Sequence, residues 1–380
     1  MGSSGKVRTQ SRCTISLVYR ICVSISLSAV DDLIARYGAA EQAGRARVPN
    51  RAIQAFSLDV FQAVGYPHRI SSSRELWRYH DVMQDGRLEH NLGLLGSAMD
   101  GEVDLVRRAA DAIVSFSVST FGFASAGKDM LSRAVYQYSL LASVLDGVPR
   151  PWTILEVGPG CGYLGVLLGL AGHRYIALEA SQAFWVYQSA LFEHVFGEEY
   201  SDGLVEGSRR ISHLAWWDFC SEGSTLPQLT ACTANGMMNE MNPMALRFTM
   251  QKLSSTQAVG TCIVADTLGS DRLHSDIETT AVIAETGFSA DEVKWRSWLF
   301  RKTDGEAKVK FFKPDFVTRL RALIFNMPLV GPASSRIWRL IRGPITSNVQ
   351  SRAKRTGVRD VMATLPSVES ADHRFRSGAW

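Results

Sequence analysis

A run of apolar residues leads directly into three alternating glycines. Residues 154–165 read Ile-Leu-Glu-Val-Gly-Pro-Gly-Cys-Gly-Tyr-Leu-Gly, so Glu156 precedes Gly158, Gly160 and Gly162. Glycine allows a tight turn and a close approach of the backbone to a ligand, and the helix that follows directs its free N–H groups toward that ligand. We therefore expect a ligand-binding turn between a strand and a helix.

Glu179 supplies a carboxylate at the end of the next predicted strand. In this position it can accept hydrogen bonds from both hydroxyl groups of a ribose. Such a charge-assisted pair contributes about 1.5–3 kcal/mol, so its loss should weaken binding on the order of 10- to 100-fold. The glycine turn and Glu179 together indicate a ligand that contains a nucleoside.

The elements that must position these residues follow from the spacing of apolar residues. Spacings of three and four predict helices at 29–37, 51–64, 103–116 and 129–145. From residue 150 onward, short β-branched runs alternate with helical stretches, which is typical of a mainly parallel α/β sheet. The predicted strands lie at 153–157, 175–178, 210–213, 230–234 and 261–265.

Two further alternating runs, 293–302 and 307–312, flank Asp304-Gly305, a dipeptide that is typical of hairpin turns. The sheet is therefore expected to end in an antiparallel pair. We divide the chain into a poorly ordered leader (1–28), a helical cover (29–148), a ligand-binding α/β domain (149–313), a basic helical extension (314–345) and a polar tail (346–380).

The chain of 380 residues has 41 Lys and Arg against 37 Asp and Glu, and 46% of its residues are hydrophobic. This composition excludes collagen-like, coiled-coil and wholly disordered chains. The net charge of +4 is unevenly distributed, because residues 301–380 hold 16 Lys and Arg against 6 Asp and Glu. Residues 316–342 have three interpretations: a helical pair packed on the α/β domain, a membrane-surface helix, or a site for a phosphorylated or nucleotide-linked sugar.

The six cysteines form no C-x-x-C pair and no His/Cys cluster at zinc spacing. We expect neither a disulfide framework nor structural zinc, and a reducing, cytoplasmic setting. Residues 11–30 loosely resemble a signal peptide, but Arg20 interrupts their middle. The longest uninterrupted apolar stretch among them is far shorter than the ~20 residues of a membrane span. No module with base-stacking aromatic residues is recognisable, so no nucleic-acid partner is expected.

The pattern Glu-x-Gly-x-Gly-x-Gly at 156–162 resembles the first motif of class I S-adenosylmethionine (SAM)-dependent methyltransferases. The resemblance implies an α/β, Rossmann-like sheet of seven strands that ends in an antiparallel hairpin, with SAM as the cofactor. Residues 160–165 also satisfy G-x-G-x-x-G, so a nicotinamide or flavin dinucleotide stays open, as does a turn with only a structural role. The antiparallel end favours a methyltransferase, because the dinucleotide fold normally continues with a second parallel half.

In a methyltransferase, an acidic or polar residue should follow the third strand, near the adenine. Asp218 is expected to accept from the adenine amino group, with Trp216 or Trp217 against the ring. Alternatively, the tryptophans are core residues and Asp218 caps the next segment. The cofactor-binding residues implied are Glu156, Gly158, Gly160, Gly162, Glu179, Trp217, Asp218 and Asn235.

The segment 213–218 and the loop 233–246 are similar to the family of sugar O-methyltransferases, a resemblance that covers about residues 110–300. It implies methyl transfer to a hydroxyl of a sugar or glycosylated small molecule, which needs a general base or a metal ion. The catalytic candidates are Glu240, His274 and Asn239. His213 is a further candidate base, and Asp266 and Asp271 could join Glu240 around Mg²⁺, although no spacing demands a metal.

The helix at 129–145 is expected to cover the pocket. Arg133 would then meet the methionyl carboxylate and Tyr136 would face the sugar, unless both have core or surface roles. Three other functions stay open: a methyltransferase for a non-sugar small molecule, an NAD-dependent oxidoreductase, and a non-catalytic SAM-binding module.

Overall fold

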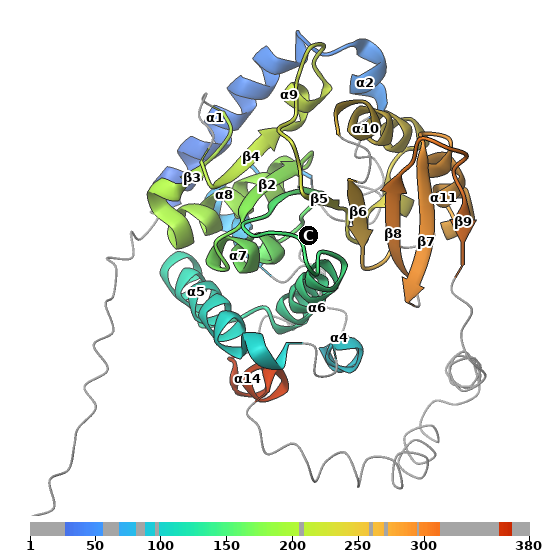
Figure 1. The fold of residues 1–380 in the computed structure, drawn as a ribbon. Coiled ribbons are helices and arrows are strands. Elements are labelled where there is room, and N and C mark those ends of the chain that lie inside the picture. Colours follow the sequence, from blue (N-terminus) through green and yellow to red (C-terminus); the bar gives the residue numbers. More distant parts are fainter. Residues whose placement is uncertain are drawn as a thin grey trace, which may run out of the picture.

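A nine-stranded sheet forms the centre of the computed structural model (Figure 1). The structure describes residues 27–55, 68–80, 88–95, 99–204, 209–257, 261–269, 273–294, 296–311 and 357–366. The strands are β1 (Thr153–Val157), β2 (Arg174–Glu179), β3 (Tyr200–Ser201), β4 (Ile211–Ala215), β5 (Ala231–Thr233), β6 (Cys262–Ala265), β7 (Phe288–Lys294), β8 (Ser297–Lys302) and β9 (Val309–Lys310).

The strands are arranged in the order β3-β4-β2-β1-β5-β6-β8-β7-β9. The pairs from β3 to β6 are parallel, and β8 lies antiparallel to both β6 and β7. This is the Rossmann-like α/β sheet of class I methyltransferases, which confirms the predicted fold and its antiparallel end. The two-residue strands β3 and β9 lie at the two edges of the sheet. β9 falls within the predicted run 307–312, whereas β3 was not predicted and the run 293–302 is divided between β7 and β8.

The antiparallel hairpin is built from different residues than predicted. It joins β7 to β8 through residues 295 and 296, whereas the Asp304-Gly305 turn leads to β9, which pairs in parallel with β7. Both edges of β8 are already occupied by β6 and β7, so the following run can add only at the outer edge of β7. The sequence pattern identified the turn but not the partner strand.

Helices join the parallel strands and cover the sheet (Figure 1). Those that lie between strands are α7 (Tyr163–Leu170), α8 (Gln182–Phe196), α9 (Trp216–Cys220), α10 (Pro243–Thr256) and α11 (Asp276–Ala284). Those that precede the sheet are α1 (Leu27–Arg45), α2 (Asn50–Ala55), α4 (Leu88–Leu95), α5 (Val103–Phe121) and α6 (Lys128–Val144), with a 3-10 helix η1 (Ser73–Tyr79). Both α5 and α6 pack against α7.

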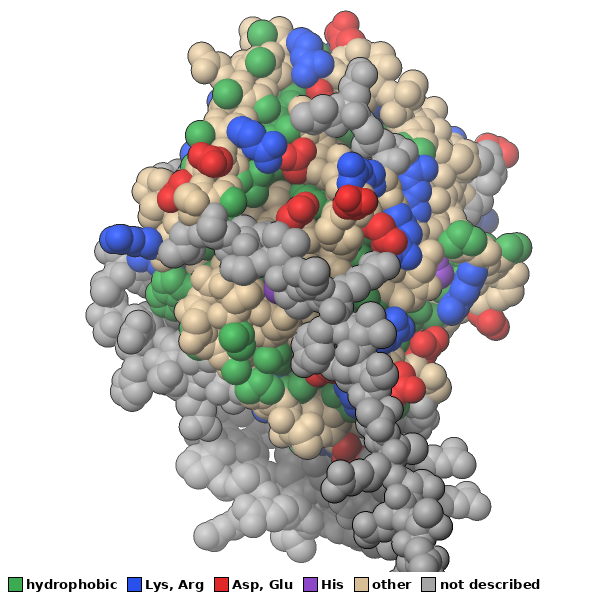
Figure 2. Space-filling view, turned by 90° about the vertical axis from the view of Figure 1, so that its left-hand side faces the viewer, with side chains coloured by type: hydrophobic (Ala, Val, Ile, Leu, Met, Phe, Trp, Pro, Cys, Tyr) green, Lys and Arg blue, Asp and Glu red, His purple; other side chains and the backbone are tan. Residues whose placement is uncertain are grey.

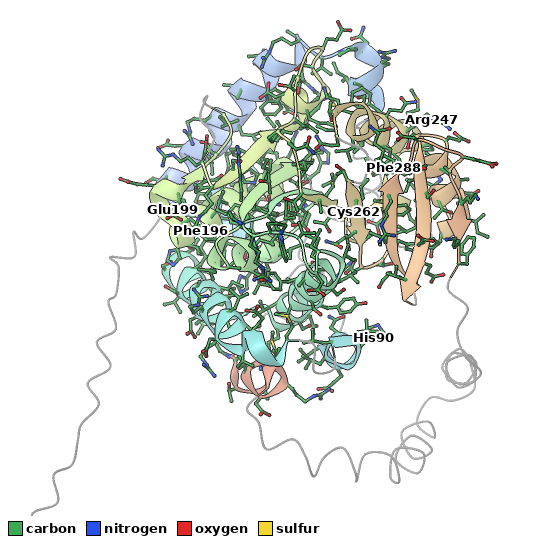
Figure 3. The ribbon with its side chains drawn as sticks, viewed as in Figure 1. His90, Phe196, Glu199, Arg247, Cys262 and Phe288 are labelled. Atoms are coloured by element: carbon green, nitrogen blue, oxygen red, sulfur yellow. The ribbon has the colours of Figure 1, made fainter. Side chains whose placement is uncertain are left out.

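On the face that Figure 2 presents, basic and acidic side chains are interspersed among neutral ones. Figure 3 shows Glu199 and Arg247 at the outer rim, whereas Phe196 and Cys262 belong to the buried interior. None of the helices in the described ranges is both long and apolar enough to cross a membrane.

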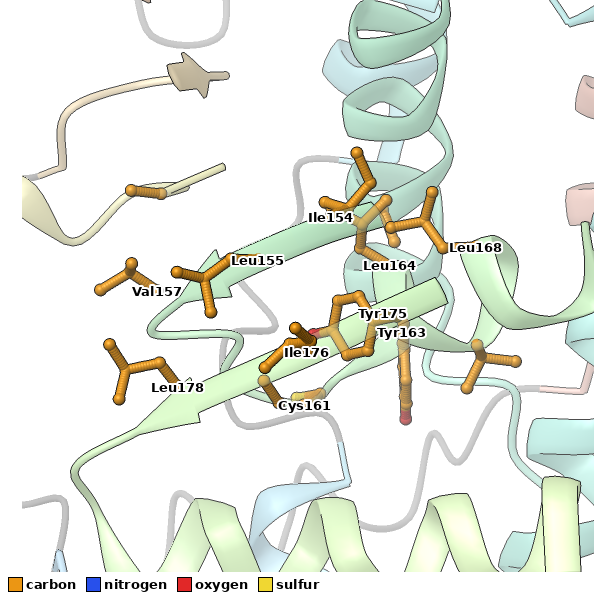
Figure 4. Packing of buried hydrophobic residues seen from close by; sticks show 14 of the residues in the cluster. Ile154, Leu155, Val157, Cys161, Tyr163, Leu164, Leu168, Tyr175, Ile176 and Leu178 are labelled. Atoms are coloured by element: carbon orange, nitrogen blue, oxygen red, sulfur yellow. The ribbon is translucent and has the colours of Figure 1, made fainter. Parts of the chain in front are cut away.

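The apolar core joins the first two strands to α7. Ile154 and Leu155 of β1 share one buried cluster with Tyr175 of β2 and with Leu164 and Leu168 of α7 (Figure 4). Residues 163–169 of α7 are all buried, so the glycine turn is held between two core elements, β1 before it and α7 after it. This packing fixes the glycine turn.

A helix near the end of the chain, α14 (Val358–Thr364), packs against α5. Val358, Val361 and Met362 are buried, and Arg359 forms a 2.7 Å ion pair with Glu89. The structure therefore differs from the polar tail that was expected for 346–380. Residues 1–26 of the leader and the basic extension 314–345 lie outside the described residues.

Candidate functional site

Each of the three predicted glycines of the turn adopts a positive φ. The values are +66° at Gly158, +59° at Gly160 and +75° at Gly162, a region that residues with a side chain rarely adopt. A Cβ on Gly162 would lie 2.9 Å from the Phe192 ring, whereas a Cβ on Gly160 would meet nothing within 4 Å. Gly162 is therefore needed for packing, and Gly160 borders open space.

A cavity with an empty volume of about 1230 Å³, counting the part open to solvent, lies over this turn. Its walls are the ends of β1 and β2, the glycine turn, one face of α6, the loop after β5 and the start of α10. The residues that carry polar side chains in this lining are Arg133, Gln137, Glu156, Tyr163, Glu179, Trp216, Asn235, Glu240 and Asn242. The remaining walls are largely apolar, including Met130, Met237 and Met241.

Glu156 is buried at the start of the turn and both of its carboxylate oxygens are hydrogen-bonded. Tyr175 donates its hydroxyl to Oε2 at 2.6 Å, and Asn235 donates Nδ2 to Oε1 at 3.2 Å. Burial raises the pKa of this carboxyl group to about 7. Glu156 thus connects the last turn-facing part of β1 to a residue near the start of β2 and to the loop after β5.

Glu179 is also buried, at the end of β2. Its Oε1 accepts from the backbone N–H of Ser181 at 2.8 Å, and its Oε2 accepts from Gln188 at 3.3 Å. Burial raises its pKa to about 7. Gln188 also donates to the carbonyl oxygen of Gly160 at 2.7 Å, so one side chain joins Glu179 to the glycine turn.

His213 lies behind this group and does not line the cavity. Its ring nitrogens contact the Tyr200 hydroxyl and Gln188 Oε1, each at 2.8 Å, and burial lowers its pKa to about 3. The structure therefore makes His213 a core histidine that positions Gln188, in place of the candidate base that the sequence suggested.

The loop after β5 divides its polar residues between the cavity and the core. Glu240 lines the cavity. Asn239 is fully buried, donating to Asp276 at 2.8 Å and accepting from Thr279 at 2.6 Å, and it does not line the cavity. His274 is likewise outside the lining and contacts the carbonyl oxygen of Met241 at 3.1 Å. Asn239 and His274 therefore stabilise the loop that contains Glu240.

The helix α6 faces the cavity with Met130, Arg133, Ala134 and Gln137. Arg133 forms an ion pair with Asp266, with Nε 2.7 Å from Oδ2, and Gln137 donates to the same carboxylate at 2.9 Å. The Tyr136 hydroxyl instead contacts Ser297 at 2.9 Å, at the antiparallel end of the sheet. The expected sugar-facing role of Tyr136 is not supported, because a different face of the helix, which carries Arg133 and Gln137, lines the cavity.

The expected adenine-binding segment is divided in the same way. Trp216 lines the cavity, but Trp217 packs against Tyr37 and Gly44 of α1 and does not. Asp218 is half-exposed and pairs with Arg47 at 3.0 Å, outside the lining. Asp218 lies inside α9, whose N-cap is Ala215, so it does not have the capping role that the sequence left as an alternative.

The structure thus brings together seven of the predicted site residues around one cavity: Glu156, Gly158, Gly160, Gly162, Glu179, Asn235 and Glu240. Trp217, Asp218, Asn239 and His274 lie outside its walls. Sequence reasoning missed Met130, Gln137, Met237 and Met241, although the spacing of Met130, Arg133 and Gln137 marks one face of α6. Asp271 lies outside the described residues, and within those residues no group of three acidic, His or Cys side chains could hold a metal ion.

No family model and no curated protein matches this sequence. Similar solved structures include magnesium protoporphyrin IX methyltransferase from Synechocystis, with 13% identity, a TM-score of 0.32, and coverage of 45% of this chain and 81% of that chain. The 1,6-didemethyltoxoflavin-N1-methyltransferase from Burkholderia thailandensis, solved with 1,6-didemethyltoxoflavin and S-adenosylhomocysteine bound, has 16% identity and a TM-score of 0.35, with coverage of 51% of this chain and 89% of that chain.

The N-methyltransferase NodS from Bradyrhizobium japonicum has 14% identity and a TM-score of 0.33, with coverage of 45% of this chain and 88% of that chain. The strand order β4-β2-β1-β5-β6-β8-β7, with β8 antiparallel to its neighbours, is the feature that decides the fold class. This chain has the fold of class I SAM-dependent methyltransferases.

Proposed function

We propose that this protein is a SAM-dependent O-methyltransferase that acts on a hydroxyl group of a sugar or glycosylated small molecule. The observation that carries the proposal is the convergence of Glu156, the glycine turn, Glu179 and Glu240 on one cavity. The first three bind a nucleoside-containing cofactor, and the fourth places a carboxylate on a different wall of the same cavity.

The residues present fit SAM. Gly160 borders open space at the turn, and Glu179 ends its strand at the cavity wall, where ribose hydroxyls can donate to its carboxylate. Trp216, one of the two tryptophans expected against the adenine ring, presents an aromatic surface for it, whereas Trp217 and Asp218 lie outside the cavity walls.

When bound, SAM supplies an electrophilic methyl group for direct displacement by the acceptor. Glu240 is our candidate general base: a carboxylate oxygen takes the proton of the attacking hydroxyl, which makes that oxygen a better nucleophile. Asn239 and His274 support it by fixing the loop. The apolar walls around Met237 and Met241 exclude water and orient the two reactants, which contributes much of the acceleration in such transfers.

The sugar assignment rests on the similarity of residues 213–218 and 233–246 to sugar O-methyltransferases. Calorimetry with S-adenosylhomocysteine (SAH) and NADH tests the cofactor class, and saturation by NADH alone would refute the proposal. A panel of glycosides and non-sugar phenols, incubated with SAM, then tests the acceptor by the mass gain of one methylene. Methylation of phenols alone would retain the methyltransferase and reject the sugar.

A further inference from the structure

The helix α1 contacts Trp216 and Trp217, the two tryptophans that follow β4. Glu41 lies four residues after Tyr37, Gly44 lies three residues after Glu41, and Arg45 lies four residues after Glu41. At these spacings the four residues share one face of α1. This face packs on α9, beside which α1 runs in Figure 1. A Cβ on Gly44 would lie 2.1 Å from the Trp217 ring, so the close approach of the two helices requires glycine there.

Within this contact, Glu41 binds the indole of Trp216. Its Oε1 accepts from the Trp216 Nε1–H at 3.2 Å, and its Oε2 accepts from the Arg69 guanidinium. Glu41 is only 6% exposed, although α1 is otherwise largely solvent-facing. The guanidinium of Arg45 lies over the same indole, 5.4 Å from the ring centroid.

These contacts restrict what Trp216 can offer to the cavity. Its single hydrogen-bond donor is engaged by Glu41, so the part of the ring that lines the cavity is an apolar aromatic surface. Rotation of the ring away from its present plane would break the bond to a buried carboxylate, which costs more than the loss of an exposed hydrogen bond. Glu41 therefore restrains the orientation of the indole.

We propose that Glu41 is a positioning residue of the cofactor site, which fixes the Trp216 ring against the nucleoside of the bound cofactor. This inference rests on the proposed function. It makes α1, a helix that precedes the sheet by more than 100 residues in the sequence, a part of the cofactor site. Arg69 supports it by holding the second oxygen of Glu41.

The test is a double-mutant cycle read by SAH calorimetry and by steady-state kinetics. Glu41→Leu removes the acceptor and is expected to raise the Kd for SAH about tenfold. It should raise the KM for SAM in parallel and leave the KM for the acceptor unchanged. In a Trp216→Phe background, which has no indole N–H, the same substitution should change the Kd by less than about twofold.

Arg36→Met is the matched control, because Arg36 forms a 2.6 Å ion pair from α1 to Asp202 and does not line the cavity. It should leave the Kd for SAH unchanged. If Glu41→Leu does not fold, the same cycle is run with Glu41→Met, which has a side chain of similar length and no oxygen to accept the indole N–H. An equal rise in Kd with and without Trp216 would show a general structural effect and overturn the inference. A wild-type protein that does not bind SAH would instead overturn the proposed function.

Discussion

Asn235 donates its side-chain amide to Oε1 of Glu156 at 3.2 Å, and its own Oδ1 accepts from the backbone N–H of Asp266 at 3.0 Å. The Asn235 side chain therefore ties Glu156, within β1, to the residues that follow β5 and β6. The glycine turn and the loop that carries Glu240 are consequently held at a fixed separation across the cavity.

Asn235→Ala should destabilise the fold through this connection. Glu156 would keep the hydrogen bond from Tyr175 but lose the partner of its buried Oε1. We expect the free energy of unfolding to fall by about 1–3 kcal/mol, measured by urea unfolding. A variant as stable as the wild type would show that the Asn235 contact does not support the turn.

Glu179→Ala should weaken SAH binding roughly 10- to 100-fold, because the ribose hydroxyls would lose a charged acceptor. Glu285→Ala is the control, since Glu285 is an exposed carboxylate paired with Arg247 on α10. Calorimetry should give the wild-type Kd for the control. Equal affinities for all three proteins would remove Glu179 from the cofactor site.

Gly160→Ala should separate backbone strain from ligand contact. Gly160 and Gly172 both have a positive φ, +59° and +84°, and a Cβ on either would meet nothing within 4 Å. Each alanine variant should lose about 1–2 kcal/mol of stability. Only Gly160→Ala should also raise the Kd for SAH, by at least about tenfold, because Gly172 follows α7 and does not line the cavity. Equal Kd values would contradict the assignment of the turn.

The stability of the ligand-free protein should depend on the ionisation of Glu179. Its pKa of about 7 in the folded chain lies above the ordinary glutamate value of about 4.3. Between these values the folded chain holds a proton that the unfolded chain has released, so stability falls as the pH rises through this window. Buried histidines with lowered pKa values, such as His80 and His213, act in the opposite direction.

The Glu179→Gln variant retains the same histidines. Comparing its stability with that of the wild type at each pH therefore cancels the contribution of the histidines. Urea unfolding between about pH 5 and 8 should show the wild type losing stability relative to this variant up to about pH 7, and no further loss above it. SAH should bind more tightly to the wild type as Glu179 ionises. A constant difference between the two proteins would contradict burial as the cause of the raised pKa.

Glu240→Gln should lower kcat on an identified acceptor by about 10²–10⁴-fold with an unchanged Kd for SAH, as expected for loss of a general base. His274→Gln, which alters the same loop outside the cavity lining, should lower kcat much less. Full turnover by Glu240→Gln would eliminate this residue as the base.

The parts of the fold and site that were predictable are those that short segments determine. The strand, the three glycines and α7 follow one another within eighteen residues, so local spacing alone predicted them. Which of two adjacent residues faces the cavity depended on distant partners. Trp217 and Asp218 are held by Gly44 and Arg47, and Asn239 is held by Asp276 and Thr279.

The orientation of α6 likewise depends on a partner that is distant in the sequence. Its periodicity predicted a helix over the pocket, but the face that turns inward is set by Asp266, which binds both Arg133 and Gln137. Likewise, the Asp304-Gly305 turn was recognisable, but the occupied edges of β8 determined where the following strand paired.

The docking of α14 has a consequence for the order in which the molecule is completed. Arg359 and Glu89 form their ion pair across 270 residues, and Ala126 donates its N–H to the carbonyl oxygen of Pro366 at 3.3 Å. During synthesis the helices that cover the pocket emerge long before this last partner exists. The sheet can therefore assemble first, while the apolar surface of α5 stays exposed until α14 has been synthesised and covers it.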